Sequence, residues 1–252
     1  MFIVLGNDKR MEFVADRLYE KGCEVSKELV NKEKIILILP PPVNIEYYDK
    51  ISLYIDNIDV IYGGAISEEF INKVNPYTQI IDYLKWPQVI YENAILTARG
   101  IIKEAIEHKA KLNNSNILVT GYGYCGKAIS KELSTLSKNV FVAVRNNKLK
   151  ENINSDGFKY VDLINIHKHP LKNINYIFNT IPAHIINIDI INKLDKSVLI
   201  FDIASKPGGV DFEYCKSKGI AAYLSLGIPG KLYPKEAGYI IADACYNHHI
   251  TF

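Results

Sequence analysis

Short apolar runs alternate with amphipathic stretches over the first 90 residues. An apolar face recurs at helical spacing within residues 8–21, which predicts a helix there. Apolar runs bounded by turn residues predict strands at 2–5, 34–39, 60–62 and 79–82, with another helix at 68–74. Strands that alternate with helices in this way indicate a small α/β domain with a parallel sheet.

The remainder of the chain repeats this alternation after a long helix. We expect that helix to begin with Asn93 as its N-cap and to run to about Leu112. Strands are predicted at 117–119, 140–144, 176–179, 198–202 and 221–224, with a helix over 127–137. A last helix from Pro234 to about His248 is expected to return to the first domain.

Composition and charge exclude several classes of function. The net charge is only +2, and charges of both signs are spread along the chain, so we expect no nucleic-acid or membrane-surface partner. Four isolated cysteines without zinc spacing predict no metal site and fit a reducing cytoplasm. We see no signal-peptide pattern and no apolar run long enough to cross a bilayer, so we expect a cytoplasmic location.

The turn after the strand at 117–119 carries three glycines in a dinucleotide-binding pattern. Gly121 allows a tight turn, Gly123 lets the backbone approach a pyrophosphate, and Gly126 lets helix and strand pack closely. An anion would then lie at the helix N-terminus, where unpaired N–H groups favour negative charge. The cofactor-binding residues expected in this turn are Gly121, Tyr122, Gly123, Tyr124, Cys125 and Gly126.

The fold class predicted is therefore α/β: two Rossmann-like domains with parallel sheets, joined by a long interdomain helix and a returning C-terminal helix. Residues 1–92 with 235–252 are expected to form a substrate and partner domain. Residues 93–234 are expected to form the NAD(P)-binding domain.

The residue at the end of the second strand of this domain indicates which dinucleotide binds. A carboxylate is usual there in NAD-binding domains, but Arg145 ends this strand and Asn146 follows it. A guanidinium binds phosphate through paired hydrogen bonds, so we expect NADP as the cofactor, with NAD as the alternative. An ordinary solvated basic turn is the other interpretation of this segment.

Three loops with turn residues follow the later strands, where ligands of open parallel sheets bind. Thr180, Ile181 and Pro182 are expected beside the nicotinamide. Ser205 and Lys206 are the candidate catalytic residues, although a loop lysine is often only a solvated charge. The residues expected to bind a carboxylate-bearing substrate are Arg10, Asn93, Thr97, Lys206, Gly208, Gly209 and Lys231.

Other polar residues leave alternatives open. Cys125 in a first helical turn is interpreted as a small packing residue, or else as a thiol of lowered pKa. His184 is either a solvated side chain or one that approaches the nicotinamide. His167 with His169, and His248 with His249, lack further metal ligands nearby in sequence.

Several segments resemble the A subunit of the dipicolinate synthase family. They are Phe178-Asn179-Thr180-Ile181-Pro182, the run from Phe201 to Phe212 that contains Ser205-Lys206-Pro207-Gly208-Gly209, Gly227-Ile228-Pro229-Gly230-Lys231, and Pro234-Lys235-Glu236-Ala237-Gly238. Gly6 to Arg10 and Asn93 to Gly100 are similar to two further family segments, with departures at Asn7, Leu96, Arg99 and Glu236.

The resemblance implies an NAD(P)-dependent oxidoreductase of sporulating bacteria. It implies oxidation of a dihydrodipicolinate-type intermediate of the lysine pathway to pyridine-2,6-dicarboxylate, in the cytoplasm of the mother cell. It also implies a partner, the flavoprotein-like B subunit, so that the enzyme is a hetero-oligomer, and a homodimer is left open. The alternatives are an NADP-dependent dehydrogenase of another small carboxylate, or a non-catalytic nicotinamide-binding sensor or structural subunit.

Overall fold

The computed structural model describes residues 1–251 and divides the chain into two α/β units. The first unit consists of residues 1–93 with the chain from 229 onward, and the second consists of residues 94–228. Residues 229–234 therefore lie in the first unit, whereas the sequence places them with the second domain.

The described part of the first unit contains one sheet of five parallel strands. These are β1 (Phe2–Val4), β2 (Val25–Ser26), β3 (Ile35–Ile38), β4 (Ile58–Gly63) and β5 (Gln79–Asp82). Their order across the sheet is β2-β1-β3-β4-β5, and every pair is parallel. The central strand β3 is buried along its whole length, as expected for a strand covered on both faces.

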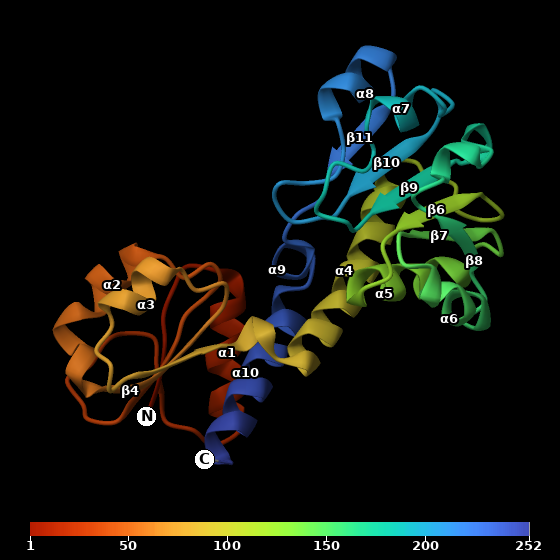
Figure 1. The fold of residues 1–252 in the computed structure, drawn as a ribbon. Helices are drawn as coiled ribbons and strands as arrows, with labels where there is room; N and C mark the ends of the chain where they lie inside the picture. The colour runs from red at the N-terminus through yellow and green to blue at the C-terminus, as the bar shows by residue number, and fades with distance from the viewer. Residues whose placement is uncertain (252) are drawn as a thin grey trace. The chain divides into compact units, whose positions relative to one another are not determined.

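Helices cover both faces of this first sheet. The two longest that belong to it wholly are α1 (Lys9–Glu20) and α10 (Pro234–Ile250), which lie side by side in Figure 1 and share one hydrophobic core. Phe70 of α3 and Ile51 of α2 belong to the core on the opposite face. The shorter elements are α2 (Ile45–Ile51), η1 (Ser52–Asn57), α3 (Glu68–Lys73), η2 (Tyr83–Lys85) and α9 (Ile228–Leu232), the last of which begins at the boundary between the units.

Within residues 94–228, six parallel strands form the second sheet. These are β6 (Ile117–Thr120), β7 (Val140–Val144), β8 (Lys159–Asp162), β9 (Tyr176–Asn179), β10 (Leu199–Asp202) and β11 (Ala221–Leu224). Their order is β11-β10-β9-β6-β7-β8, so the direction of winding reverses between β6 and β9. Ligands of open α/β sheets bind beyond the carboxyl ends of the strands at such a reversal.

Helices cover both faces of the second sheet as well. One core includes residues of α4 (Pro87–Glu107), α5 (Tyr124–Ser134) and α6 (Lys150–Ser155), and the opposite core includes residues of α7 (Ile188–Ile191) and α8 (Phe212–Lys218). Figure 1 shows α7 and α8 on the other side of this sheet from α5 and α6. The short elements are η3 (Asn147–Leu149), η4 (Ile166–Lys168) and η5 (Leu171–Asn173).

The predicted fold class is confirmed, including the return of the C-terminal helix: Ile241 and Cys245 of α10 are buried in the same core as Val14 of α1. The predicted start of the long helix at Asn93 is wrong, because α4 begins at Pro87. Proline suits the first turn of a helix, where its missing N–H would have no helical partner. The strands and α-helices missing from the predicted pattern are β2, β8, α2, α6, α7, α8 and α9.

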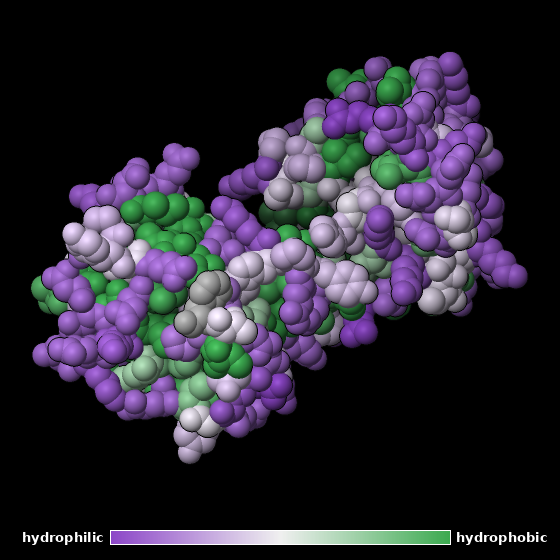
Figure 2. Space-filling view, turned by 60° about the horizontal axis from the view of Figure 1, so that its bottom comes forward, coloured by the Kyte–Doolittle hydropathy of each residue, from purple (hydrophilic) through white to green (hydrophobic). Residues whose placement is uncertain are grey.

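The surface is mixed in character. On the face drawn in Figure 2, hydrophilic residues are spread over both units, and patches of hydrophobic residues reach the surface on each of them. The most exposed large hydrophobic side chains, Leu53 and Tyr77, both belong to the first unit. No helix within residues 1–251 has the length and apolar character needed to cross a membrane.

Candidate dinucleotide site and strand-end loops

The glycine turn between β6 and α5 has the geometry that its sequence predicts. Gly121 has φ +95°, a conformation that side-chain-bearing residues rarely adopt, and a Cβ atom there would overlap the hydroxyl of Thr180. A Cβ atom at Gly126 would overlap the carbonyl of Gly121, so the first turn of α5 packs directly on the backbone. These two glycines are therefore required by the fold.

Gly123 differs from its two neighbours because a Cβ atom there would meet no atom within 4 Å. It is the N-cap of α5, and no side chain caps the helix. The N–H groups of the first turn are therefore left without a side-chain acceptor at the edge where the sheet reverses its winding. This combination of open space and uncapped N–H groups fits the pyrophosphate of a dinucleotide.

The side chains of the turn have different surroundings. Tyr122 is buried, stands edge-on to the ring of Phe158, and donates a hydrogen bond to the carboxylate of Asp156. Burial, followed by that carboxylate, raises the pKa of Tyr122. Tyr124 is half exposed. Tyr122 can therefore serve a ligand only through its backbone, whereas Tyr124 has a free face.

Cys125 packs against the core beside α5, and burial raises the pKa of its thiol. Of the two interpretations from the sequence, the structure supports the small packing residue. A reactive thiolate would require a lowered pKa.

Arg145 and Asn146 follow directly after β7 and are both exposed. Asn146 accepts a hydrogen bond from the backbone N–H of Lys148, at 3.1 Å, and so shapes the turn. Among the ion pairs formed by the described residues, none involves Arg145. Its guanidinium is therefore available to a ligand, and no carboxylate stands at the end of this strand to repel a phosphate.

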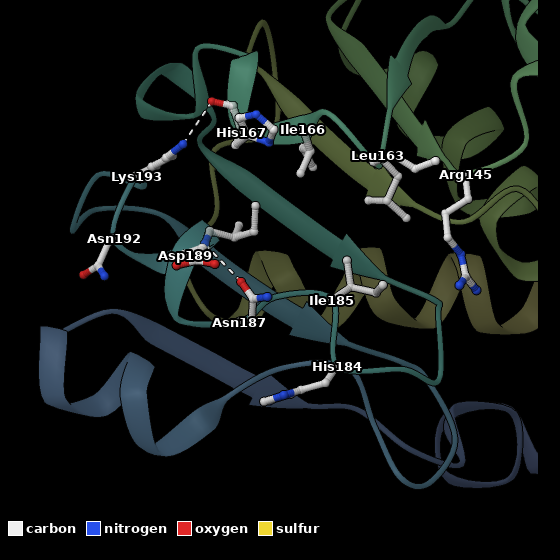
Figure 3. A pocket seen from close by; sticks show the side chains of 12 residues that line it. Arg145, Leu163, Ile166, His167, His184, Ile185, Asn187, Asp189, Asn192 and Lys193 are labelled. Atoms are coloured by element: carbon white, nitrogen blue, oxygen red, sulfur yellow. Dashed lines mark hydrogen bonds between the residues drawn. The ribbon is translucent and has the colours of Figure 1, made fainter.

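Arg145 also lines a pocket of about 550 Å³ beyond the ends of β7, β8 and β9. Figure 3 shows Arg145 at one end of this pocket, Ile185 in the middle, and Lys193 with His167 at the other end. The ammonium group of Lys193 donates to the backbone carbonyl of His167, at 3.1 Å. His184 lies on the rim of the same pocket, so the structure groups it with Arg145.

The loop after β9 is tied to the glycine turn. The hydroxyl and the backbone N–H of Thr180 donate to the carbonyl of Thr120, at 2.8 and 3.0 Å. Ile181 is partly buried and Pro182 is exposed. The structure thus brings two of the predicted cofactor segments, 121–126 and 180–182, together at the reversal of the sheet.

The loop after β10 carries the candidate catalytic residues, Ser205 and Lys206, and both are exposed. Lys206 lines a hollow of about 670 Å³ whose other walls are mainly apolar, among them Val210, Phe212 and Leu224. Gly208 has φ +86° and turns the loop, and Gly209 is buried behind it. The two glycines, predicted as substrate-binding, therefore also have structural roles.

Arg10 and Lys231 belong to the first unit. Nε and Nη2 of Arg10 donate to the two carboxylate oxygens of Asp8, at 2.9 and 2.6 Å. Burial opposes the charge of Arg10, but the Asp8 carboxylate outweighs it and raises the pKa of the guanidinium, and hydrogen bonds from Arg10 lower the pKa of Asp8. Asp8 also caps α1, so Arg10 is held firmly, whereas Lys231 is exposed.

Asn93 and Thr97 both lie inside α4, and Thr97 is buried. Neither is at a helix N-terminus, so a role for Asn93 as the N-terminal end of a carboxylate site is not supported. The described residues contain no group of three or more metal-ligating side chains.

Three buried polar residues beneath these loops have no role among those predicted from the sequence. Thr120, Asn179 and Asp202 end β6, β9 and β10, and all three are completely buried. The signal was present in the sequence, because each is a polar residue at the end of an apolar strand. Only the structure shows that the three side chains meet.

This chain has relatives among known proteins. No protein-family model matches it. The A subunit of dipicolinate synthase from Bacillus subtilis (strain 168) is 32% identical over 187 residues, which are 73% of this chain. The match spans 62% of that relative, less than two thirds of its length.

Solved structures extend the likeness to almost the whole fold. The crystal structure of the dipicolinate synthase A subunit from Bacillus halodurans has a TM-score of 0.86 at 25% identity, covering 98% of this chain and 96% of that one. Salmonella D-lactate dehydrogenase has a TM-score of 0.65 at 12% identity, with coverage of 98% and 96%, and shows that the fold is shared with oxidoreductases. In sequence and in fold, the chain therefore belongs among the relatives of the dipicolinate synthase A subunit.

Proposed function

We propose that this chain is the NADP-dependent A subunit of a dipicolinate synthase. In this proposal it oxidises a dihydrodipicolinate-type intermediate of the lysine pathway to pyridine-2,6-dicarboxylate during sporulation, in the mother cell. A flavoprotein-like B subunit is its partner. The observation that carries the proposal is the uncapped N-terminus of α5 behind the open Gly123, together with Arg145 at the end of β7.

The cofactor part of the proposal follows from these residues. The first turn of α5 would hold the pyrophosphate through backbone N–H groups, and Arg145 would bind the 2′-phosphate with paired hydrogen bonds. Asn146 shapes the turn that carries Arg145. The loop at 180–182 would border the nicotinamide, as the switch point of the sheet suggests.

The substrate part rests on the relatives and on the chemistry of the strand-end loops. Aromatisation of a dihydropyridine ring removes one hydride and one proton, and a bound nicotinamide supplies the hydride acceptor. The chain then needs mainly to hold two carboxylates and orient the ring. We propose Lys206, on its partly apolar hollow, as one carboxylate ligand.

The test is an absorbance assay on the purified chain with freshly generated dihydrodipicolinate. NADP or NAD is supplied, with and without the B subunit, and the reduced-nicotinamide and dipicolinate bands are followed together. We expect both bands to grow in parallel, faster with NADP. With verified substrate and an active partner, no growth of either band in any mixture would contradict the synthase activity and favour a different substrate or a binding role.

A further inference from the structure

Three polar side chains form a continuous row across the second sheet. The parallel register pairs Thr120 with Asn179 and Asn179 with Asp202, so the last residues of β6, β9 and β10 are neighbours. All three have no exposed surface. Polar groups buried this completely are retained in a core only when their hydrogen bonds are satisfied.

The backbone of the next loop fixes the orientation of the Asn179 amide. Its Oδ1 accepts from the N–H of Ile181, at 3.2 Å, and its Nδ2 donates to the carbonyl of the same residue, at 3.1 Å. Because an N–H can only donate and a carbonyl can only accept, the amide cannot be flipped. The hydroxyl of Thr120 must then donate to Oδ1. Asn179 thus clamps the loop that begins at Thr180.

Asp202 clamps the loop that carries Lys206. Its Oδ1 accepts from Nδ2 of Asn179, at 2.7 Å, and from the N–H of Ala204, at 3.2 Å. Its Oδ2 accepts from the N–H of Gly209, at 2.9 Å. The carboxylate therefore holds both ends of the segment 204–209 and joins it to Asn179.

Close packing surrounds this row. A Cβ atom at Gly209 would overlap Nδ2 of Asn179 and lie 2.6 Å from the carbonyl of Ile181, so the loop approaches as closely as a backbone can. One residue earlier in the same strands, the rings of Phe178 and Phe201 stack with their centroids 5.2 Å apart. The two phenylalanines point to the opposite face of the sheet and pack the strands that carry the row, whereas the Gly209 contact leaves the side chains of the row little room to move.

We propose that Asn179 and Asp202 are positioning residues that set the conformation of the Lys206 loop relative to the dinucleotide turn. They touch neither substrate nor cofactor, because both are fully buried, and they act through Lys206. The exposed Lys206 has a long flexible side chain, so its carboxylate-binding position depends on the backbone that carries it. The catalytic consequence rests on the proposed function, whereas the structural consequence does not.

The first variant is Asp202→Asn, which keeps the size of the side chain and places an amide NH₂ against N–H donors. In the synthase assay we expect substrate kcat/KM to fall about ten- to hundredfold, as a misplaced binding group does, while the affinity for NADP stays within about twofold. Asp211→Asn is the matched control, because Asp211 caps α8 just after the loop and asparagine caps equally well. Equal losses in both variants would overturn the proposal.

A double-mutant cycle tests the contact between the two side chains. Asn179→Asp alone sets a second carboxylate against Asp202 and should be the most damaging change. Exchange of the two residues, Asn179→Asp with Asp202→Asn, restores an amide against a carboxylate. We expect the variant with both residues swapped to recover part of the lost kcat/KM, since the effects of mutations within one hydrogen-bond network are not additive. Strictly additive losses would contradict a shared clamp.

Hydrogen exchange of the backbone amides tests the proposal without any enzymatic assay. In Asp202→Asn, the amides of Ala204 and Gly209 should exchange at least about tenfold faster, since opening a local segment requires less free energy once its acceptor is lost. The amides of α10 should be unchanged. Unchanged exchange at Ala204 and Gly209 would overturn the proposal. If the wild-type chain is inactive and the variant still exchanges faster, only the synthase activity is overturned.

If Asp202→Asn does not fold, Thr120→Val provides the second variant. Valine has nearly the shape of threonine and removes only the hydroxyl that donates to Asn179, and Thr120→Ser keeps that hydroxyl. We expect faster exchange of the Ile181 amide in the valine variant and not in the serine variant. The same exchange rate in both would contradict the clamp.

Discussion

In the proposed cofactor site, Arg145 is the side chain that would most directly distinguish NADP from NAD. It follows β7 without an ion-pair partner among the described residues, and it lines the pocket at the ends of β7, β8 and β9. A ribose 2′-hydroxyl bound at this point could be held by a carboxylate, but a 2′-phosphate needs a cation. In the proposed site, the preference for NADP over NAD would therefore depend on the charge of Arg145.

Arg145→Asp should reverse that preference. We expect NADP affinity to fall about ten- to hundredfold and NAD affinity to rise, because a carboxylate repels the phosphate and accepts from the hydroxyl. Titration calorimetry with both dinucleotides measures the change. Lys196→Asp is the control, since it makes the same charge change in the exposed turn before β10. Affinities that do not move in Arg145→Asp would remove this residue from the site.

At the level of single elements, α1 and α10 pack together in the first unit although they are far apart in the sequence. The carboxylate of Asp243 on α10 forms salt bridges with Nε of Arg17, at 3.0 Å, and with Nζ of Lys21, at 2.9 Å. Arg17 and Lys21 lie at the C-terminal end of α1. Gly238 lets the two helices approach, because a Cβ atom there would lie 2.6 Å from the carbonyl of Arg10. Salt bridges and close packing therefore both hold α10 against α1.

Asp243 gives this docking a dependence on pH. Burial alone would raise the pKa of Asp243, but hydrogen bonds from Arg17 and Lys21 outweigh it and lower the pKa. A carboxyl with a lowered pKa in the folded state stabilises that state at neutral pH, and the contribution is lost as pH falls through the folded pKa.

We expect Asp243→Asn to lower Tm by about 1 to 3 °C at pH 7, a modest effect because the pair is partly exposed. The difference from wild type should shrink as the pH is lowered below about 4, where the ordinary aspartate titrates. Differential scanning calorimetry across this pH range checks it, with the exposed Asp49→Asn of α2 as the control. A Tm difference between wild type and Asp243→Asn that grows as the pH is lowered would contradict the predicted direction.

Most elements followed from local patterns because strands and helices differ in the period of their apolar residues. The start of α4 was missed because Asn93 has the chemistry of an N-cap, whereas Pro87 stands at the first turn six residues earlier. Helix α2 was missed although Asn44 caps it, by accepting from the N–H of Glu46. Short elements depend on tertiary contacts that a sequence does not display.

Some parts of the candidate site could be predicted from the sequence and others could not, depending on whether their residues are close together in the chain. The glycine turn is local, so its three glycines show their roles in sequence, and the structure gives each a matching environment. The row of Thr120, Asn179 and Asp202 depends on the register of three strands that are far apart in the chain. Pairing of that kind brings side chains together only after the sheet has formed.

For the whole molecule, the two units have separate hydrophobic cores, and the candidate cofactor site lies in only one of them. The single tryptophan, Trp86, belongs to the first unit, where it stacks on His248 with ring centroids 5.0 Å apart. Its fluorescence therefore reports the unfolding of the first unit, while far-ultraviolet circular dichroism reports the unfolding of both units. A ligand of one unit can be located by comparing the two signals.

NADP should raise the thermal stability of the second unit. A ligand at a hundredfold excess over Kd stabilises the folded state by about 2.7 kcal/mol, which corresponds to several degrees in Tm. We expect the dichroism transition to move upward more than the Trp86 fluorescence transition. A fluorescence transition that moves further than the dichroism would place the ligand on the first unit and contradict the site.

Gly123→Ala identifies the turn responsible for that shift. Gly123 has φ −77°, which alanine adopts freely, and the added methyl group meets no protein atom, so Tm without ligand should not fall. The methyl group would nevertheless occupy the space through which the pyrophosphate approaches the α5 N–H groups, so most of the NADP-dependent shift should disappear. Ser134→Ala, at the other end of α5, should keep the full shift. If Gly123→Ala also keeps the full NADP-dependent shift, the dinucleotide binds elsewhere.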